Sequence, residues 1–148
     1  MLTTGSPVID AERAFVRAAR ARTRASLARR LRRAPRSCSE LAVYDGRAVA
    51  RGGIAARRGI REIPLDLIRG TTEPARAPLF DGDFRPAAAA RVRWQRLWLA
   101  EHRGTVLPPI SVVPIADGYA VRDGHHRVSV ARARGALTID ATMDSLAV

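Results

Sequence analysis

The stretch that decides the fold is residues 108–143, PPISVVPIADGYAVRDGHHRVSVARARGALTIDATM. A short apolar run between prolines and an alternating run are each typical of strands, and "ADG" at 116–118 is typical of the turn of a hairpin. The pattern predicts strand, strand, helix and strand, at Pro108–Ile115, Tyr119–Asp123, His125 or His126 to Arg134, and Leu137–Met143. We therefore expect an α+β fold, a small mixed sheet with helices around it.

A long basic helix is predicted before this region. It begins with Asp10 as its cap and runs to about Arg33, before Pro35. Its thin apolar side is Phe15, Ala19, Leu27 and Leu31. One face carries arginines at helical spacing, Arg13, Arg17, Arg20 and Arg24. Guanidinium groups in such a row could follow a DNA backbone, or the row could be the solvated side of a helix packed on the domain.

The middle of the chain predicts a strand, a loop and a helix. Ile60–Ile68 has strand character, and residues 69–85 are rich in Gly, Pro and Thr, which is typical of a loop. Proline at the first turn predicts a helix over Pro86–Arg103. Trp94 and Trp98 supply part of its apolar surface, and we expect both in the core.

Basic charge is concentrated at one end of the chain. The formal net charge is +12, and all 26 basic residues are arginine. Residues 1–62 hold 15 arginines and 5 acids, whereas residues 63–148 hold 11 and 9. We divide the chain into a basic helical segment, 1–59, and an α+β domain, 60–148. Such a segment is attracted to polyanions, including nucleic acid.

Membrane and export signals are missing from the sequence. No run of 18 or more apolar residues occurs, and the N-terminus lacks a basic-then-apolar leader. Cys38 is the only cysteine, which excludes an internal disulfide and a cysteine metal cluster. We expect a cytoplasmic protein, and the sequence leaves its oligomeric state open.

The chemistry concentrates in DGHHR, which starts at residue 123. Here a strand gives way to a helix, whose first N–H groups lack partners and whose dipole favours an anion. Gly124 lets the backbone bend sharply and lets a ligand approach closely. Arg127 offers a forked, permanently charged donor, and His125 and His126 offer further donors. The stretch predicts a phosphate-binding site, with Asp123 as a cap or helper.

Other chemistries fit these residues less well. Adjacent histidines diverge by about 100° on a helix, and the spacing of H-E-x-x-H is absent, so we assign no metal site. Ser129 lies one turn further on and favours an inward position or a bond to its own helix over a nucleophilic role. A plain structural alternative stays open, in which Asp123 caps the helix and both histidines lie at the surface.

With EIPLDLI at Glu62–Ile68, the region Leu107–Met143 resembles the N-terminal domain of the ParB family, which shares its fold with sulfiredoxin. In ParB proteins a G-E-R-R-x-x-A motif opens a helix and binds nucleotide phosphates. In sulfiredoxin the matching F-G-G-C-H-R binds ATP, and its cysteine is catalytic. Gly124 and Arg127 match both motifs, and His126 matches the sulfiredoxin histidine. The resemblance implies a bound nucleotide, CTP or ATP, with Mg²⁺.

Departures from both families limit what the resemblance implies. His125 replaces the catalytic cysteine, so we expect no sulfinic-acid reduction, and it also replaces the ParB glutamate. Few residues follow Met143, so we expect no helix-turn-helix in this chain. Short actinobacterial ParB-like proteins are similar to it throughout. The implied function is a nucleotide-binding ParB-like domain associated with DNA, as in chromosome partitioning.

An enzyme of the same fold, a phosphotransferase or nuclease, is the alternative. His125 or His126 would then act as the acid–base group, because an unperturbed imidazole has a pKa near neutrality. Arg76 could close over the ligand in either case. Loop carboxylates that could hold Mg²⁺ are Glu73, Asp81 and Asp83. A partner-binding domain without catalysis is a third interpretation.

Overall fold

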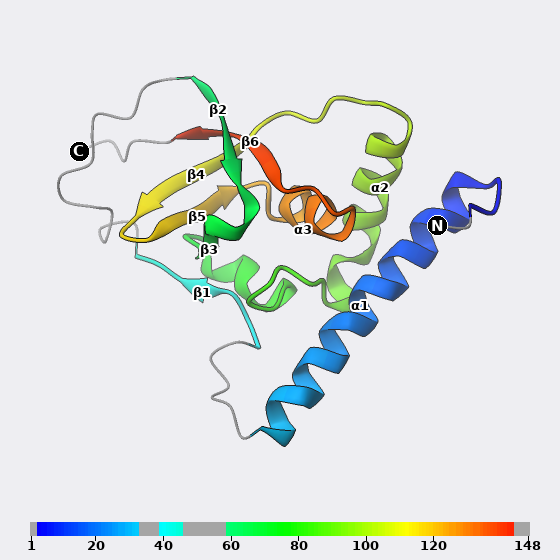
Figure 1. The fold of residues 1–148 in the computed structure, drawn as a ribbon, viewed down its shortest axis with the longest axis horizontal. Helices are drawn as coiled ribbons and strands as arrows, with labels where there is room; N and C mark the ends of the chain where they lie inside the picture. Colours follow the sequence, from blue (N-terminus) through cyan, green and yellow to red (C-terminus); the bar gives the residue numbers. More distant parts are fainter. Residues whose placement is uncertain (1–2, 33–38, 46–58, 144–148) are drawn as a thin grey trace.

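The computed structural model describes residues 3–32, 39–45 and 59–143, and these residues form a mixed sheet and three α-helices. Helices α2 (Arg91–His102) and α3 (His125–Ala133) lie beside the sheet, and α1 (Pro7–Leu31) forms an outer layer against them (Figure 1). The predicted α+β class, with a small mixed sheet, surrounding helices and a basic N-terminal helix, is confirmed.

The sheet has six strands in the described part of the chain, in the order β1-β3-β5-β4-β6-β2. Their bounds are β1 Ala42–Val43, β2 Ile60–Pro64, β3 Ile68–Thr71, β4 Ile110–Ile115, β5 Gly118–Asp123 and β6 Thr138–Met143. The pairs β4–β5 and β2–β6 are antiparallel, and β1–β3, β3–β5 and β4–β6 are parallel. Strand β1 comes from the segment that we separated as 1–59, so the sheet spans the expected boundary.

The predicted order of strand, strand, helix and strand is confirmed. Strands β4 and β5 form a hairpin in which Ile115 pairs with Gly118, which leaves a two-residue turn. Val112 pairs with Val121, and both are fully buried in the core between the sheet and the helices. Because β-branched side chains pack well on a pleated surface, this hairpin can form the centre of the sheet.

Glycine marks both ends of α3. Gly124 is its N-cap, with φ of 102°, and Gly135 follows it with φ of 79°. A Cβ at Gly124 would lie 2.5 Å from Cγ2 of Ile110, so only glycine fits this position on both conformational and steric grounds. The group that lies closest to the Cα of Gly124 on the side where a Cβ would stand is therefore the Ile110 side chain.

Helix α2 begins later than the sequence pattern predicts. Pro86, expected at its first turn, instead forms an isolated antiparallel bridge with Phe80, and the α-helix spans Arg91–His102 after a short 3-10 turn. The two tryptophans are core residues, as predicted, with exposures of 0% for Trp94 and 5% for Trp98. Their rings join the helices to one another rather than to the sheet.

The predicted strand at Ile60–Ile68 and loop at 69–85 are only partly right. The strand is broken by a 3-10 turn at Leu65–Leu67, and the supposed loop contains most of β3 and a second 3-10 helix at Pro74–Leu79. Strand β3 takes its conformation from pairing with β5, fifty residues away in the sequence. Pairing of this kind leaves no local periodicity to detect.

Helix α1 begins before Asp10, so the predicted cap is wrong. Ser6 is the N-cap and Pro7 occupies the first helical turn, where its missing N–H costs nothing. Asp10 accepts hydrogen bonds from the backbone N–H and the hydroxyl of Thr4, at 3.0 and 2.9 Å. Its carboxylate therefore ties down the residues that precede the helix.

Among the described residues, the buried side chains of α1 all lie in its first half, and in the second half Arg22 donates a hydrogen bond to the Ser39 carbonyl at 3.2 Å. Ala11, Ala14 and Phe15 are buried against α2 and α3, and the rings of Phe15 and Trp94 meet edge to face with centroids 5.5 Å apart. The predicted apolar contribution of Leu27 and Leu31 is wrong, because these side chains are 57% and 78% exposed. The second half of the helix projects from the body (Figure 1).

Some expectations fall on other parts of the chain. Pro35 and Cys38 lie outside the described residues. Among the described helices, none is both long and apolar enough to cross a membrane.

Candidate phosphate-binding site

A cavity of about 170 Å³ lies at the start of α3. Every residue predicted for the phosphate site lines it, namely Asp123, Gly124, His125, His126, Arg127 and Arg76. Further lining residues, absent from the sequence prediction of the site, are Arg93, Leu97 and Arg122. Glu73, expected as a magnesium ligand, lines the same cavity. The structure thus brings together residues from three segments of the chain, 73–76, 93–97 and 122–127.

The backbone of α3 contributes free donors to this cavity. Its first intrahelical bond runs from the N–H of Val128 to the carbonyl of Gly124, at 3.0 Å. The N–H groups of residues 125–127 precede that bond and have no partner within the helix. Together with the helix dipole, they favour a negative charge at this end of α3.

His125 is fixed inside the protein by Thr71 on β3. It is 4% exposed, and its Nε2 lies 2.6 Å from the Thr71 hydroxyl, a hydrogen bond whose donor depends on the imidazole tautomer. The same hydroxyl lies 3.2 Å from the Val121 carbonyl and accepts the N–H of Glu73 at 2.9 Å. This network holds β3, β5 and the first turn of α3 in one arrangement.

His126 is also buried, at 6% exposure. Its ring meets Phe80 edge to face, with centroids 5.1 Å apart. The alternative in which both histidines are surface residues is therefore wrong. A strand–turn–helix junction of this type packs the first helical turn against the core.

Burial keeps both imidazoles neutral. Desolvation, reinforced by Arg76 and then His126, lowers the pKa of His125 to about 4, although Asp123 opposes this shift. Desolvation, reinforced by Arg93 and Arg76, lowers the pKa of His126 to about 4. Near neutral pH each ring can donate one hydrogen bond but carries almost no positive charge.

Arg127 has a structural task that the sequence did not reveal. Its Nη1 donates to the carbonyls of Pro108 and Pro109, the latter at 2.8 Å, and its Nη2 lies 3.1 Å from the Asp123 carboxylate. The side chain is 13% exposed. It therefore fastens the chain that enters β4 to the first turn of α3. Asp123 is its ion-pair partner and makes no side-chain cap to the helix.

Arg76 and Arg93 supply positive charge from outside the motif. Arg76 comes from the 3-10 helix Pro74–Leu79 and Arg93 from the first turn of α2. Both are exposed, and both line the cavity. Four arginines surround it against two acids, Glu73 and Asp123. The balance favours an anion.

The carboxylates expected to hold Mg²⁺ do not come together. Asp81 is fully buried and accepts the N–H groups of Asp83 and Arg85 at 3.0 and 2.9 Å, and the Arg85 guanidinium pairs with both carboxylates. These contacts shape the turn before α2. Within the described residues, no group of three or more His, Cys, Asp or Glu side chains could hold a metal ion.

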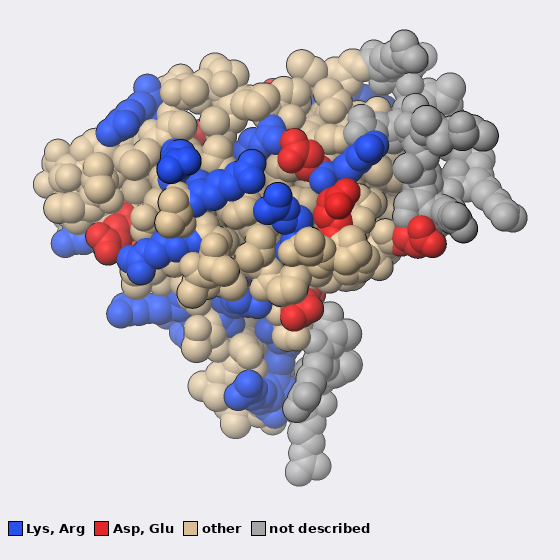
Figure 2. Space-filling model, turned by 180° about the vertical axis from the view of Figure 1, so that it is seen from behind, with Lys and Arg blue, Asp and Glu red and all other residues tan. Residues whose placement is uncertain are grey.

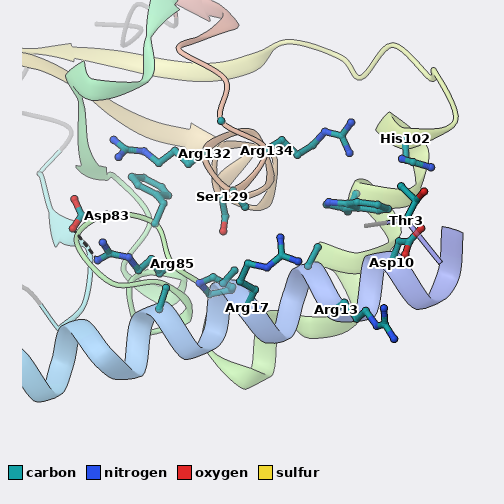
Figure 3. Close-up of a pocket in the computed structure, with 18 residues that line it drawn as sticks. Thr3, Asp10, Arg13, Arg17, Asp83, Arg85, His102, Ser129, Arg132 and Arg134 are labelled. Atoms are coloured by element: carbon teal, nitrogen blue, oxygen red, sulfur yellow. Dashed lines mark hydrogen bonds and ion pairs between the residues drawn. The ribbon is translucent and has the colours of Figure 1, made fainter. Parts of the chain in front are cut away.

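The predicted arginine face of α1 exists but is not uniform. Arg13, Arg17, Arg20 and Arg24 lie along one side of the helix and are exposed. In Figure 3, Arg17 points toward α3, whereas the guanidinium of Arg13 points away from it. Basic side chains are also visible among other residues at the projecting end of α1, at the bottom of Figure 2. This end has the exposure that contact with a polyanion requires.

Two of the important side chains lacked a usable local signal. Thr71 sits in a segment that resembles a loop, and its link to His125 spans 54 residues. Arg93 is one of several arginines on α2, and only the packing of that helix against α3 brings it to the cavity. A search restricted to the neighbourhood of DGHHR could not have found them.

Comparisons with known proteins give little further information. No protein-family model matches the chain, and no curated protein matches it. Among solved structures, the chain is similar to sulfiredoxin from Arabidopsis thaliana, with 22% identity and a TM-score of 0.42, over 59% of this chain and 85% of the sulfiredoxin. A likeness of this size carries no inference about activity.

Proposed function

We propose that this chain binds the phosphate group of a nucleotide at the start of α3. The observation that carries the proposal is the arginine-ringed cavity onto which the first turn of that helix opens. Its volume, about 170 Å³, is below that of sites that enclose a whole small molecule. It suits a phosphate or diphosphate group, with the nucleoside lying outside. The sequence resemblance to nucleotide-binding families is consistent with this arrangement.

The neutral histidines support binding more than acid–base catalysis. A general acid must hold a proton at the working pH, and a pKa of about 4 leaves His125 and His126 almost unprotonated near neutrality. A neutral imidazole can accept a proton, but a pKa of about 4 makes each ring a weak general base. As a neutral ring, His126 can still donate one hydrogen bond to a phosphate oxygen, and His125 can do so in the tautomer that carries its proton on Nδ1. We therefore prefer a binding domain over a phosphotransferase or nuclease.

Arg93 provides the clean test of this site. Arg127→Ala would also release the chain before β4, so a loss of binding in that variant would be ambiguous. Arg93→Gln removes a charge from an exposed side chain at the cavity, and Arg96→Gln removes the same charge one turn further along α2, away from the cavity. Because a charged hydrogen bond is worth about 1.5–3 kcal/mol, we expect Arg93→Gln to weaken binding by about tenfold or more.

The measurement is a thermal-shift screen of CTP, ATP, GTP and pyrophosphate with Mg²⁺, followed by calorimetric titration of any ligand that raises Tm. The proposal expects at least one nucleotide to bind, Arg93→Gln to lose most of that affinity, and Arg96→Gln to retain it. If no nucleotide and no pyrophosphate shifts Tm, the proposal fails. Equal losses in the two variants would mean that the ligand senses only net charge.

We further propose contact with nucleic acid through α1. From Arg13 to Leu31 the helix carries seven arginines and no acid, and its second half projects away from the body. Exposed guanidinium groups on a projecting helix can reach phosphates without a steric barrier. Nothing on this surface suggests sequence reading, so we propose backbone contact only.

Salt dependence tests this second proposal. Each neutralised phosphate contributes about −0.9 to the slope of log K against log salt for duplex DNA, so Arg20→Gln with Arg24→Gln should flatten the slope by about 2. The control pair, Arg61→Gln with Arg96→Gln, removes the same charge from exposed positions elsewhere. Fluorescence anisotropy of a labelled duplex measures the slopes. Equal slopes in the two double variants would contradict a role for α1.

A further inference from the structure

A second and larger hollow lies at the other end of α3. It has a volume of about 720 Å³ and lies between the first half of α1 and the second half of α3 (Figure 3). The turn at residues 83–86 closes one end, and Trp98 and His102 of α2 line the other. We call it the α1–α3 groove. Its size falls within the range of about 300–1,000 Å³ typical of small-molecule sites.

Small side chains on α1 keep the groove open. Ala14, Ala18 and Ala21 recur at helical spacing and line it. Phe15 instead packs beside Trp94, so the contact with α2 holds α1 in place without filling the space next to α3. The result is a gap between α1 and α3, each of which packs on α2, rather than a closed interface.

The groove combines apolar surface with arginine. Phe84, Pro86 and Trp98 contribute apolar groups. The charged lining residues are Arg13, Arg17, Arg85, Arg132 and Arg134, with only two acids, Asp10 and Asp83. Both acids already have partners, because Asp10 accepts from Thr4 and Asp83 pairs with Arg85 at 3.0 Å. Arg134 also pairs with Glu101, at 3.5 Å. With five arginines against two acids in its lining, the groove keeps an excess of positive charge.

Two arginines hold donors that the described residues leave unused. The Nε of Arg132 is buried and has no hydrogen-bond partner, although its Nη2 donates to the Leu65 carbonyl at 2.7 Å and its guanidinium lies 5.9 Å from the Phe84 ring centroid. Within the described part of the chain, Arg17 has no ion-pair or hydrogen-bond partner, and it points across the groove toward α3. A buried donor without a partner costs about 1–3 kcal/mol. The Nε of Arg132 has almost no accessible surface, so a ligand oxygen offsets this cost only if the Arg132 side chain shifts toward the groove.

We propose that the α1–α3 groove binds a small organic anion, with an apolar body against the alanines and Phe84 and an acidic group at Arg17 and Arg132. The inference does not depend on phosphate binding at the start of α3. A neutral apolar molecule would leave the guanidinium groups of Arg17 and Arg132 without an anionic partner. A purely inorganic anion would leave the apolar surface of the groove exposed to water. The ligand needs both parts.

A matched pair of dyes tests whether the groove requires both an apolar body and an acidic group. Anilinonaphthalene sulfonate and N-phenyl-1-naphthylamine share an aromatic body, and only the first carries an anionic group. Trp98 lines the groove, so energy transfer from tryptophan to a dye reports that the dye binds close to it. We expect the sulfonate to bind about tenfold tighter than the uncharged dye, the size of effect given by one charged hydrogen bond. Equal affinities would overturn the anionic part of the proposal.

Three single variants test whether the dye binds in the α1–α3 groove. Arg17→Gln should weaken the sulfonate by about tenfold and leave the uncharged dye unchanged, since it removes only the charge. Arg20→Gln lies outside the groove and should change neither, and Arg93→Gln should change neither because its cavity is at the opposite end of α3. If Arg17→Gln and Arg20→Gln behave alike, or if Arg93→Gln alone reduces binding, the groove is not the site.

A filling variant tests the apolar part. Ala18→Phe should block both dyes, and its circular dichroism and Tm establish whether α1 stays docked. Ala21→Leu, nearer the projecting half of α1, provides a milder filling for the same comparison. Full binding of both dyes in a folded Ala21→Leu or Ala18→Phe protein would overturn the proposal.

Discussion

The two ends of α3 differ in how they are built. Its start, at Gly124, is a closed junction in which buried imidazoles, a threonine hydroxyl and the Arg127 guanidinium fit one arrangement. Its end, near Gly135, opens onto a wide groove whose wall is a separate helix. Both ends are rich in arginine. The difference teaches that arginine can line a compact site fixed by the surrounding backbone at one end of a helix and an open groove at the other.

Glycine substitutions should show the largest difference in stability between the two ends of α3. Gly124→Ala places a Cβ 2.5 Å from Ile110 and keeps a positive φ, so we expect a loss of about 2–5 kcal/mol in the free energy of unfolding. Gly135→Ala also keeps a positive φ, but a Cβ there meets nothing within 4 Å. Its cost should be only about 1–2 kcal/mol. Urea unfolding of the two variants measures both, and equal costs would contradict the tight junction at Gly124.

Acid should weaken the junction at the start of α3. In the unfolded chain the histidine pKa is 6.5, and in the folded chain both values are about 4. The unfolded state therefore binds more protons between these values, so this contribution is complete above pH 6.5 and is lost as the pH falls toward 4. We expect a loss of about 2 kcal/mol per histidine by pH 4.5.

The control for this prediction is His126→Gln, which removes one of the two titrations. Urea unfolding across the pH range should show a shallower decline for the variant than for the parent protein. Parallel declines would mean that other groups, not the buried imidazoles, carry the acid sensitivity.

Arg127 and Asp123 separate structure from charge at the same junction. Arg127→Ala leaves the carbonyls of Pro108 and Pro109 without their donor, and we expect a loss of about 1–3 kcal/mol. Asp123 is 71% exposed, so Asp123→Asn should change stability by less than about 1 kcal/mol. Chemical denaturation measures both changes. A larger cost for Asp123→Asn would show that the ion pair, rather than the carbonyl contacts, holds the junction.

The smallest expected effect is at Leu27, and its contrast with Phe15 distinguishes the two halves of α1. Phe15→Ala should cost about 3–5 kcal/mol if the whole helix unfolds with the body, since Phe15 packs on Trp94. Leu27→Ala should cost less than about 0.5 kcal/mol, because that side chain is 57% exposed on the projecting half. Thermal unfolding of the pair checks this contrast. A large cost for Leu27→Ala would mean that its side is covered in solution.

The parts of the fold that could be predicted are those with local signals. The hairpin, α3 and β6 follow from alternation, turn residues and the glycines around α3. Strands β1 and β3 could not be predicted, because pairing between distant residues determines them. The two exposed leucines of α1 were placed on its packed side because periodicity shows which residues share a face, but not how far a partner surface extends.

The features of the candidate site also fall into those that the local sequence predicts and those that depend on tertiary packing. DGHHR identified the start of α3 and the residues nearest to it, since a glycine before a helix is a local feature. Burial of the histidines, their low pKa values, the Thr71 contact and the contribution of Arg93 all arise from tertiary packing. The sequence therefore indicated where the site lies but not the protonation state of its groups.

Backbone amide shifts of the first turn of α3 test the central proposal most directly. In a titration followed by ¹⁵N-resolved NMR, a phosphate accepted by this turn should move the amide signals of His125, His126 and Arg127 downfield together, at the concentrations at which calorimetry detects a nucleotide. We expect saturable shifts confined to these amides and their neighbours around the cavity. Shifts limited to α1, or none at a concentration that saturates binding, would contradict the proposal.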